Sequence, residues 1–346
     1  MENHSNNYRF CIAPMMEYTD RHFRFLMRLF SSNIRLYTEM ISVDALIYGD
    51  TKSLLNYNLS ENPLALQLGG SDPEKLIQCS IIAESFGYNE INLNIGCPSV
   101  RVKSGNFGAC LMDQPRLVAK CVKKIKSKVK IPVTVKCRIG IDNQDPEIEL
   151  KKFIKHITEA GVDAIIIHAR KAFLSGISPK KNREVPPLIY DLVYEIKELF
   201  SSTPIVINGG ITSYSDIKDH LNKVDGVMLG RAIIQDPMLL ANVDEEIFGV
   251  SNHDFDIRVL LEQYLDYAYL QHSSGVSIPN LIRPIINFFY NTPSAKVWRK
   301  NLTSVNYKEV NPGYILESYE TYAEALQSHI KRLRHNVYLD ESIYMV

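Results

Sequence analysis

The segment PIVINGGITSYSDIKDHLNKVDGVMLGR, residues 204–231, decides the fold of this chain. It holds two short apolar runs, Pro204–Ile207 and Gly226–Leu229, with a polar stretch of helical character between them over Thr212–Leu221. Short runs of Ile, Val and Leu are typical of parallel strands that are covered on both faces. The segment therefore predicts a strand, a helix and a second strand of one parallel sheet, and each strand ends in a glycine-containing turn.

Further apolar runs precede this segment along the chain: Arg9–Met15, Arg35–Met40, Pro63–Leu68, Glu90–Ile95, Ile131–Cys137 and Ala164–His168. The stretches predicted as helices are Lys75–Phe86, Arg116–Lys126, Glu149–Ala160, Thr212–Leu221 and Ala232–Ala241. Eight alternating β and α units in roughly 240 residues are typical of a (β/α)8 barrel. The main alternative is a doubly wound sheet, which more often has its glycine-rich turn after the first strand. Here that turn, Ala13–Met16, has no glycine.

The strand pattern stops near Asp254, and three helical stretches follow: Asp256–Gln271, Ile278–Tyr290 and Glu317–Leu333. We therefore predict an α/β protein in which a (β/α)8 TIM barrel spans residues 1–250. A small C-terminal helical domain is expected over residues 251–346.

Composition narrows the function classes. The 346 residues include 39 Lys and Arg against 39 Asp and Glu, which excludes a highly basic nucleic-acid coat, so RNA could bind only through a local patch. No stretch reaches the ~18 uncharged apolar residues of a membrane span, and the polar start has no signal-peptide pattern. None of the six cysteines forms a CxxC pair, so we expect no metal site and a reducing, cytoplasmic environment.

The carboxyl ends of barrel strands carry active sites, and phosphates often bind after strands seven and eight. Strand seven ends in Asn208-Gly209-Gly210 and strand eight in Gly230-Arg231. Glycines let the backbone approach a ligand closely, and the helix N-termini that follow favour an anion. A phosphate site is therefore expected at these two loops.

The other strand ends add polar and reactive groups. Cys97 lies on the loop after strand four, Lys136 and Arg138 end strand five, His168 ends strand six, and Gln67 lies in strand three. Cys110 is a weaker candidate thiol, and the remaining cysteines are expected in the core. A phosphate site beside a lysine, a histidine, an amide and a thiol suits flavin mononucleotide (FMN), whose N1–O2 edge favours a cation such as Lys136.

Several motifs resemble the tRNA-dihydrouridine synthases: Asn92-Leu93-Asn94-Ile95-Gly96-Cys97-Pro98-Ser99, APMMEYTDRHFR from Ala13, Leu66-Gln67-Leu68-Gly69, Val135-Lys136-Cys137-Arg138-Ile139-Gly140 and His168-Ala169-Arg170. The resemblance runs in order from about residue 9 to residue 249. HARKAFLSGISPKKNREVPPL from His168 and SAKVWRKNL from Ser294 are similar to the A-type branch of that family.

This resemblance implies an FMN barrel with a C-terminal tRNA-binding domain. Tightly bound FMN, reduced by NADPH, would pass a hydride to C6 of a D-loop uridine near nucleotide 20, and Cys97 would protonate C5. Contact with the tRNA substrate is implied for Asn94, Arg138, Lys180, Arg183, Lys296 and Arg299. The flavin shell is implied to comprise Ala13, Pro14, Met15, Gln67, Lys136, His168, Asn208, Gly209, Gly210, Gly230 and Arg231. We expect a monomer without metal or membrane attachment.

Two alternatives stay open. Another FMN barrel oxidoreductase could act on a free pyrimidine such as dihydroorotate, and it would not need the C-terminal helices or a basic patch. A non-catalytic tRNA-binding protein could use an inactive barrel, but its sequence would be expected to lack Cys97, Lys136 or the phosphate loops, and all of these are present. The only tryptophan, Trp298, is expected to pack in a core rather than to stack on a base.

Overall fold

The computed structural model describes residues 8–99, 102, 105–251 and 255–343, and the side chains only up to residue 331. The chain forms two compact units. The barrel unit comprises Met1–Arg28, Asn33–Gly230 and Glu246–Phe248. The helical unit comprises Leu29–Ser32, Arg231–Glu245 and Gly249–Val346.

Parallel strands form the core of the barrel unit: β1 (Phe10–Ile12), β2 (Leu36–Tyr37), β4 (Leu64–Gly69), β5 (Glu90–Ile95), β6 (Val133–Arg138), β7 (Ala164–His168), β8 (Ile205–Asn208) and β9 (Gly226–Leu229). They pair in the order β1-β9-β8-β7-β6-β5-β4-β2, and a short extra strand, β3 (Ile41–Ser42), pairs with β4. Backbone bonds from Ile12 N to Arg35 O and from Arg35 N to Phe10 O, both 2.9 Å, close the ring between β1 and β2. The predicted strands and the TIM barrel are confirmed, and the closed ring excludes the doubly wound alternative.

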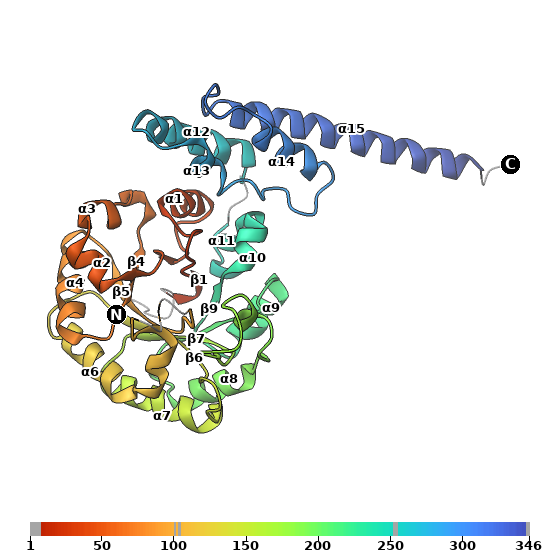
Figure 1. Cartoon of the computed structure of the whole chain (residues 1–346). Helices are drawn as coiled ribbons and strands as arrows, with labels where there is room; N and C mark the ends of the chain where they lie inside the picture. The colour runs from red at the N-terminus through yellow and green to blue at the C-terminus, as the bar shows by residue number, and fades with distance from the viewer. Residues whose placement is uncertain (1–7, 100–101, 103–104, 252–254, 344–346) are drawn as a thin grey trace. The chain divides into compact units, whose positions relative to one another are not determined.

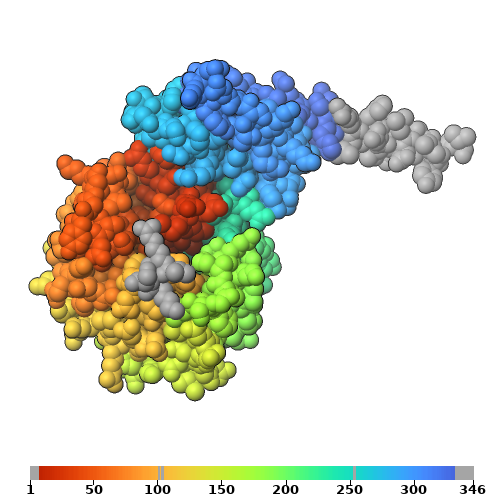
Figure 2. All heavy atoms as spheres, viewed as in Figure 1, coloured from red at the N-terminus to blue at the C-terminus, as the bar shows by residue number. Residues whose placement is uncertain are grey.

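Helices surround the strands on the outside of this ring (Figure 1). They are α1 (Arg21–Phe30), α2 (Val43–Tyr48), α3 (Thr51–Leu54), α4 (Pro73–Ser85), α6 (Pro115–Lys126), α7 (Pro146–Glu159), α8 (Tyr190–Leu199) and α9 (Tyr214–Leu221). Asp72 and Asp145 cap α4 and α7, and each is followed by a proline in the first turn, where a missing N–H costs nothing. Figure 2 shows that successive segments follow one another around the barrel unit in chain order.

Two predicted helices are shorter than expected. The stretch Ala232–Ala241 breaks into α10 (Arg231–Gln235) and a 3-10 turn that begins at Pro237. The stretch Ile278–Tyr290 is helical only as α13 (Ile278–Ile282). Pro237 and Pro284 have no N–H to donate to the carbonyl four residues earlier, which explains why neither helix continues.

The helical unit also contains α12 (Ile257–Ser273), α14 (Ala295–Thr303) and α15 (Tyr314–Ile343), and α11 (Val243–Phe248) lies partly in each unit. Its core is built around Trp298, whose indole N–H donates to Ile285 O at 3.0 Å. The Phe289 ring meets the Trp298 ring edge-on, with centroids 5.3 Å apart. The packing role expected for Trp298 is confirmed. Among the described residues, no helix is long and apolar enough to cross a membrane.

Candidate active site

The register of the parallel sheet brings the predicted site residues of neighbouring strands together. Directly adjacent positions are occupied by Gln67 and Asn92, by Asn94 and Lys136, by Arg138 and His168, and by His168 and Asn208. All of these except Asn92 lie in the carboxyl-terminal half of their strands, so their side chains can meet at one mouth of the barrel.

Cys97 lies on a turn that Asn94 holds in place. Asn94 Oδ1 accepts hydrogen bonds from the N–H groups of Gly96 at 3.1 Å and of Cys97 at 3.0 Å. The Cys97 carbonyl accepts a bond from Ala109 N at 2.9 Å. Gly108 lies so close that a Cβ there would be 2.6 Å from that carbonyl oxygen. The half-buried thiol is therefore presented by a turn that is held on both sides, and we call residues 94–97 the Cys97 turn.

The remaining cysteines differ from Cys97. Cys11, Cys79, Cys121 and Cys137 are buried, as predicted, and burial raises the pKa of the Cys11 thiol to about 12. The Cys110 thiol is half-buried, and its Sγ lies 3.1 Å from the carbonyl oxygen of Phe107.

Lys136 is a half-buried cation at the mouth. Its Nζ donates to Asn208 Oδ1 at 3.0 Å, and Asn208 Nδ2 donates in turn to Met228 O at 2.7 Å. Burial, together with the positive charge of Arg138, lowers the pKa of Lys136 to about 8. Within the described part of the chain, no carboxylate lies within ion-pair distance of Lys136. This cation is therefore available for an anionic ligand.

Glycines make room beside Lys136. Gly209 has a φ of +115°, and a Cβ there would lie 2.6 Å from the His168 ring. Gly210 has a φ of +74°, and a Cβ there would lie 2.6 Å from Leu188. Side chains at either position would be strained and would clash, so this loop requires glycine. The Tyr190 hydroxyl also donates to Gly209 O at 2.7 Å.

The loop after β1 forms another part of the mouth. Ala13 N donates to Leu229 O at 2.7 Å, which joins this loop to the end of β9. Met15 N donates to Thr19 Oγ1 at 3.0 Å, and Thr19 N donates to Met15 O at 2.9 Å. A Cβ on Gly230 would be in ordinary contact with Ala13, at 3.5 Å. Pro14 lies half-buried between the two ends of this loop.

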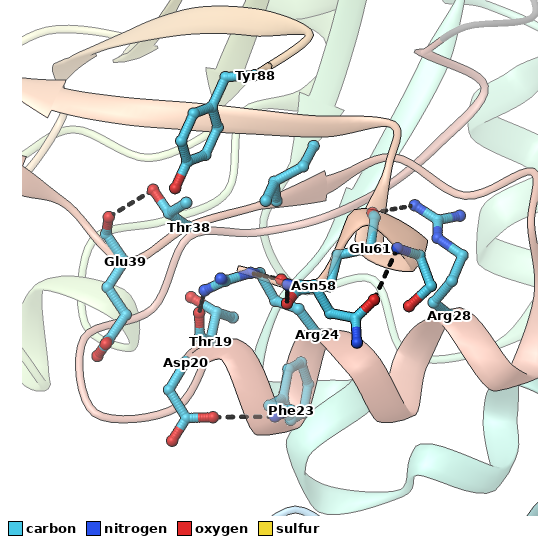
Figure 3. A network of polar contacts seen from close by, with 12 residues as sticks. Thr19, Asp20, Phe23, Arg24, Arg28, Thr38, Glu39, Asn58, Glu61 and Tyr88 are labelled. Atoms are coloured by element: carbon cyan, nitrogen blue, oxygen red, sulfur yellow. Dashed lines mark hydrogen bonds and ion pairs between the residues drawn. The ribbon is translucent and has the colours of Figure 1, made fainter. Parts of the chain in front are cut away.

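A buried ion pair supports the loop after β1. Figure 3 shows Arg24 of α1 between Thr19 and Glu61. Arg24 Nε lies 2.6 Å from Glu61 Oε2, and its Nη1 donates to Thr19 O at 2.8 Å. Glu61 Oε1 also accepts from Asn58 N at 2.7 Å, and Arg28 donates to Glu61 O at 3.0 Å. The loop is thus tied to two charged side chains that are shielded from water.

Arg138 is buried and bonds to backbone carbonyls. Nε donates to Gly96 O at 3.2 Å, and Nη1 donates to Lys171 O at 3.0 Å and to Asn182 O at 2.8 Å. Burial lowers the pKa of Arg138 to about 10. Arg138 therefore connects the Cys97 turn to the long loop after β7, and its predicted contact with substrate stays a prediction.

The predicted basic residues of the barrel unit are exposed. Lys180 and Arg183 lie on the loop after β7, at a 3-10 helix that spans Lys181–Arg183. Asn182, which is fully buried, fixes this loop by bonding to Phe173 N at 2.7 Å and to Phe173 O at 2.9 Å. The loop is therefore fixed by Asn182 and exposes the cationic side chains of Lys180 and Arg183 to solvent.

The helical unit carries its own predicted basic residues on α14. Lys296 is exposed and Arg299 is half-buried. They border a pocket of about 330 Å³ together with Tyr290. Arg231 begins α10 directly after Gly230 in the chain.

The residues that hold the site in place were not singled out from the sequence. They include Arg24, Glu61, Glu90, Thr134 and Asn182. One signal was available, because Glu90 is a charged residue at the start of a strand whose other residues are uncharged. The acids and bases on α1 and its neighbours give no such signal, since charged residues are common on solvated helix faces.

Comparisons with known proteins agree with these observations. The chain matches the family model described as dihydrouridine synthase (Dus) over residues 11–331. A tRNA-dihydrouridine(20/20a) synthase of Synechocystis sp. is 47% identical over 292 residues, which cover 84% of this chain and 87% of that protein. One of the same name from Escherichia coli strain K12 is 49% identical over 301 residues, with 87% of each chain covered.

A solved structure of a 2-naphthoyl-CoA reductase in complex with 2-naphthoyl-CoA is also similar. The TM-score is 0.52 at 13% identity, and the match covers 68% of this chain and 50% of that one. This likeness concerns the fold alone.

Proposed function

This chain belongs to the dihydrouridine synthase family, and from that premise we propose that it reduces the 5,6 double bond of a D-loop uridine in tRNA, at position 20 or 20a. The curated relatives carry that substrate in their names. The observation that carries the proposal is the Cys97 turn, which presents a half-buried thiol beside Lys136 and Asn208 at one barrel mouth. The names give no support to the free-pyrimidine alternative.

The residues of the mouth fit FMN. A phosphate needs close backbone approach, and glycines allow it after both strands: Gly209 and Gly210, which have positive φ, follow β8, and Gly230 follows β9. A reduced flavin ring carries negative charge, and Lys136 is a cation without a carboxylate partner in the described structure. Gln67 and His168 complete the polar lining in this proposal, and Ala13–Met15 contribute from the loop after β1.

When bound, FMN reduced by NADPH supplies the hydride that reaches C6 of the uracil ring. The role of Cys97 is to donate its Sγ proton to C5 of the same ring. Asn94 orients the thiol through the backbone of the turn, and its remaining Nδ2 hydrogen can bind a carbonyl of the base. Lys136 stabilises negative charge on the cofactor side.

The tRNA binds through local basic groups rather than through net charge, which is zero. Lys180 and Arg183 on the loop after β7 and Lys296 and Arg299 on α14 contact phosphates in this proposal. The target base must leave its stack to reach a barrel mouth, which costs little for a loop nucleotide. The enzyme works as a monomer in the cytoplasm.

The decisive test is mass spectrometry of tRNA that lacks dihydrouridine, after incubation with the FMN-loaded protein and NADPH. A mass gain of two hydrogen atoms on a D-loop fragment is expected, and fragment sequencing names the nucleotide. A flavin that is bound and reduced by NADPH while tRNA gains no mass would contradict the proposal. Turnover of dihydroorotate in the same preparation would then favour the free-pyrimidine alternative.

A further inference from the structure

A chain of side-chain hydrogen bonds runs through the barrel interior along β5. Glu90, Asn92 and Asn94 alternate along this strand and therefore project to the same face. The register places Gln67 of β4 and Thr134 of β6 directly beside Asn92. Glu90, Asn92 and Thr134 are fully buried, and Gln67 is 1% exposed. Because these groups are shielded from bulk solvent, their bonds to one another decide their orientation.

Each bond in this chain has a fixed direction. Thr134 has one hydroxyl hydrogen and donates it to Glu90 Oε1 at 2.5 Å. Its oxygen therefore faces Asn92 as an acceptor, and Asn92 Nδ2 donates to it at 2.8 Å. Gln67 Nε2 donates to Asn92 Oδ1 at 2.7 Å, and Asn94 Nδ2 donates to Gln67 Oε1 at 2.8 Å. Because every donor points toward Glu90, the oxygen of Asn94 is left facing the Cys97 turn.

The end of the chain at Glu90 is held by charge. Glu90 Oε2 lies 3.1 Å from Arg35 Nη1, with side chains 0% and 6% exposed. Burial raises the pKa of Glu90, and the positive charge of Arg35 opposes this rise. Replacing a buried ion pair by apolar residues is often neutral or stabilising, so the pair is weak evidence for a role in stability alone. A carboxylate can only accept hydrogen bonds, which is the property that gives the chain its direction.

We propose that Glu90 and Thr134 are positioning residues, which fix the amides of Asn92, Gln67 and Asn94 in one orientation and thereby hold the Cys97 turn. They act through these amides from the opposite end of β5. In the same orientation the second Nδ2 hydrogen of Asn94 is available to a nucleobase. The barrel mouth would therefore accept a base that presents a carbonyl oxygen there in preference to one that presents an amino group. The importance of the turn for catalysis rests on the proposed function, whereas the positioning itself does not.

The test compares two substitutions at Thr134. Thr134→Val removes the hydroxyl at nearly constant volume, and Thr134→Ser keeps the hydroxyl and removes only a methyl group. The first readout is the alkylation rate of Cys97 by iodoacetamide in the unloaded protein, measured by peptide mass spectrometry. We expect the Cys97 alkylation rate of the Val variant to differ from that of wild type by about fivefold. This ratio corresponds to the net free energy of one hydrogen bond. Cys110 in the same sample is the internal control and should be unchanged.

The second readout is turnover of tRNA by the FMN-loaded protein. We expect kcat of Thr134→Val to fall by about fivefold while KM for tRNA is unchanged, and Thr134→Ser to behave as wild type. Both are measured below the unfolding temperature of each variant, so a loss of stability alone would move neither value. Glu90→Gln, whose amide can donate to Thr134, should change both the Cys97 alkylation rate and kcat further.

Equal Cys97 alkylation rates and equal kcat values in the Val and Ser variants would overturn the proposal. A wild-type chain that forms no dihydrouridine would instead contradict the proposed function, and the alkylation comparison would still decide on the positioning role. If Glu90→Gln fails to fold because Arg35 loses its counter-charge, the Thr134 pair gives the answer. If Thr134→Val fails to fold, a Glu90→Gln protein with wild-type alkylation would overturn the proposal.

Discussion

The barrel unit and the helical unit hold their charged side chains in different ways. In the barrel unit, the side chains of Arg24 and Glu61 are 6% and 0% exposed in their ion pair. In the helical unit, Arg258 and Glu262 pair while 51% and 48% exposed. The barrel unit also has exposed pairs, such as Lys75 and Asp44 at 36% and 65% exposure, so burial rather than the unit alone separates the two kinds of pair. Substitutions at the buried pair and at the exposed pair should therefore fail in different ways.

The largest effect is expected at Cys97. Cys97→Ala should still bind FMN and tRNA, and NADPH should still bleach the flavin, but dihydrouridine formation should fall by about 10² to 10⁴-fold because the proton donor is gone. Cys110→Ala is the matched control and should keep its activity. The measurement is tRNA mass spectrometry over time, together with the flavin absorbance. Full activity of Cys97→Ala would remove the thiol from the mechanism.

The contrast in ion pairs predicts a second effect. Arg24→Met should lower the free energy of unfolding by about 3 to 5 kcal/mol, because it leaves the Glu61 carboxylate buried without a partner. It should also weaken FMN binding, since the Thr19 carbonyl loses its donor. Arg258→Met in the helical unit should leave stability unchanged within error. Urea denaturation and FMN titration measure these values, and equal stability of the two variants would contradict the contrast.

Lys136 predicts a dependence of stability on pH. Its pKa is about 8 in the folded chain, against an ordinary value of about 10.4 when unfolded. Between these values the unfolded chain binds the extra proton, so Lys136 should contribute a gain of about 2 to 3 kcal/mol in stability, measured relative to Lys136→Met, as pH rises through this window. Lys136→Met should lack this gain, and Lys155→Met, which changes an exposed lysine, should retain it.

The check is urea denaturation of the three unloaded proteins at both ends of the window. A difference between wild type and Lys136→Met that stays constant with pH would show that Lys136 keeps an ordinary pKa.

The smallest effect is expected in the helical unit. Lys296→Ala combined with Arg299→Ala should weaken tRNA binding by about tenfold and reduce the salt dependence, because phosphate contacts release counterions. The flavin spectrum and the turnover of bound tRNA should be unchanged. Lys308→Ala, at another exposed lysine, is the control. Titrations at two salt concentrations measure the effect, and unaltered affinity would remove this patch from the interface.

Most of the fold could be predicted from the sequence because apolar runs that are covered on both faces leave a strong signal. The segment over residues 204–231 forms β8, α9 and β9 as expected. Helix ends were less predictable, since they depend on a single missing N–H at Pro237 or Pro284. The helix α14 (Ala295–Thr303) is not among the helices predicted from the sequence.

The candidate site could be predicted to the extent that its residues lie at strand ends. Lys136, His168 and Asn208 occupy adjacent strands because parallel pairing brings all carboxyl ends to one mouth. The residues behind them could not be predicted in the same way. Glu61 and Thr134 act through partners far away in the chain, at separations of 37 and 44 residues. A charge or a hydroxyl in a sequence does not indicate which distant group it will meet.

Arg138 couples the geometry of two loops. One planar side chain bonds to carbonyls on both the turn after β5 and the loop after β7, and the guanidinium fork that allows this has no equivalent in lysine. An insertion that moved Lys171 or Asn182 would remove one of the three carbonyl acceptors of a buried cation and disturb the side chain that also holds Gly96. A change of length in the loop after β7 is therefore expected to be felt at the Cys97 turn unless it is confined to the exposed tip.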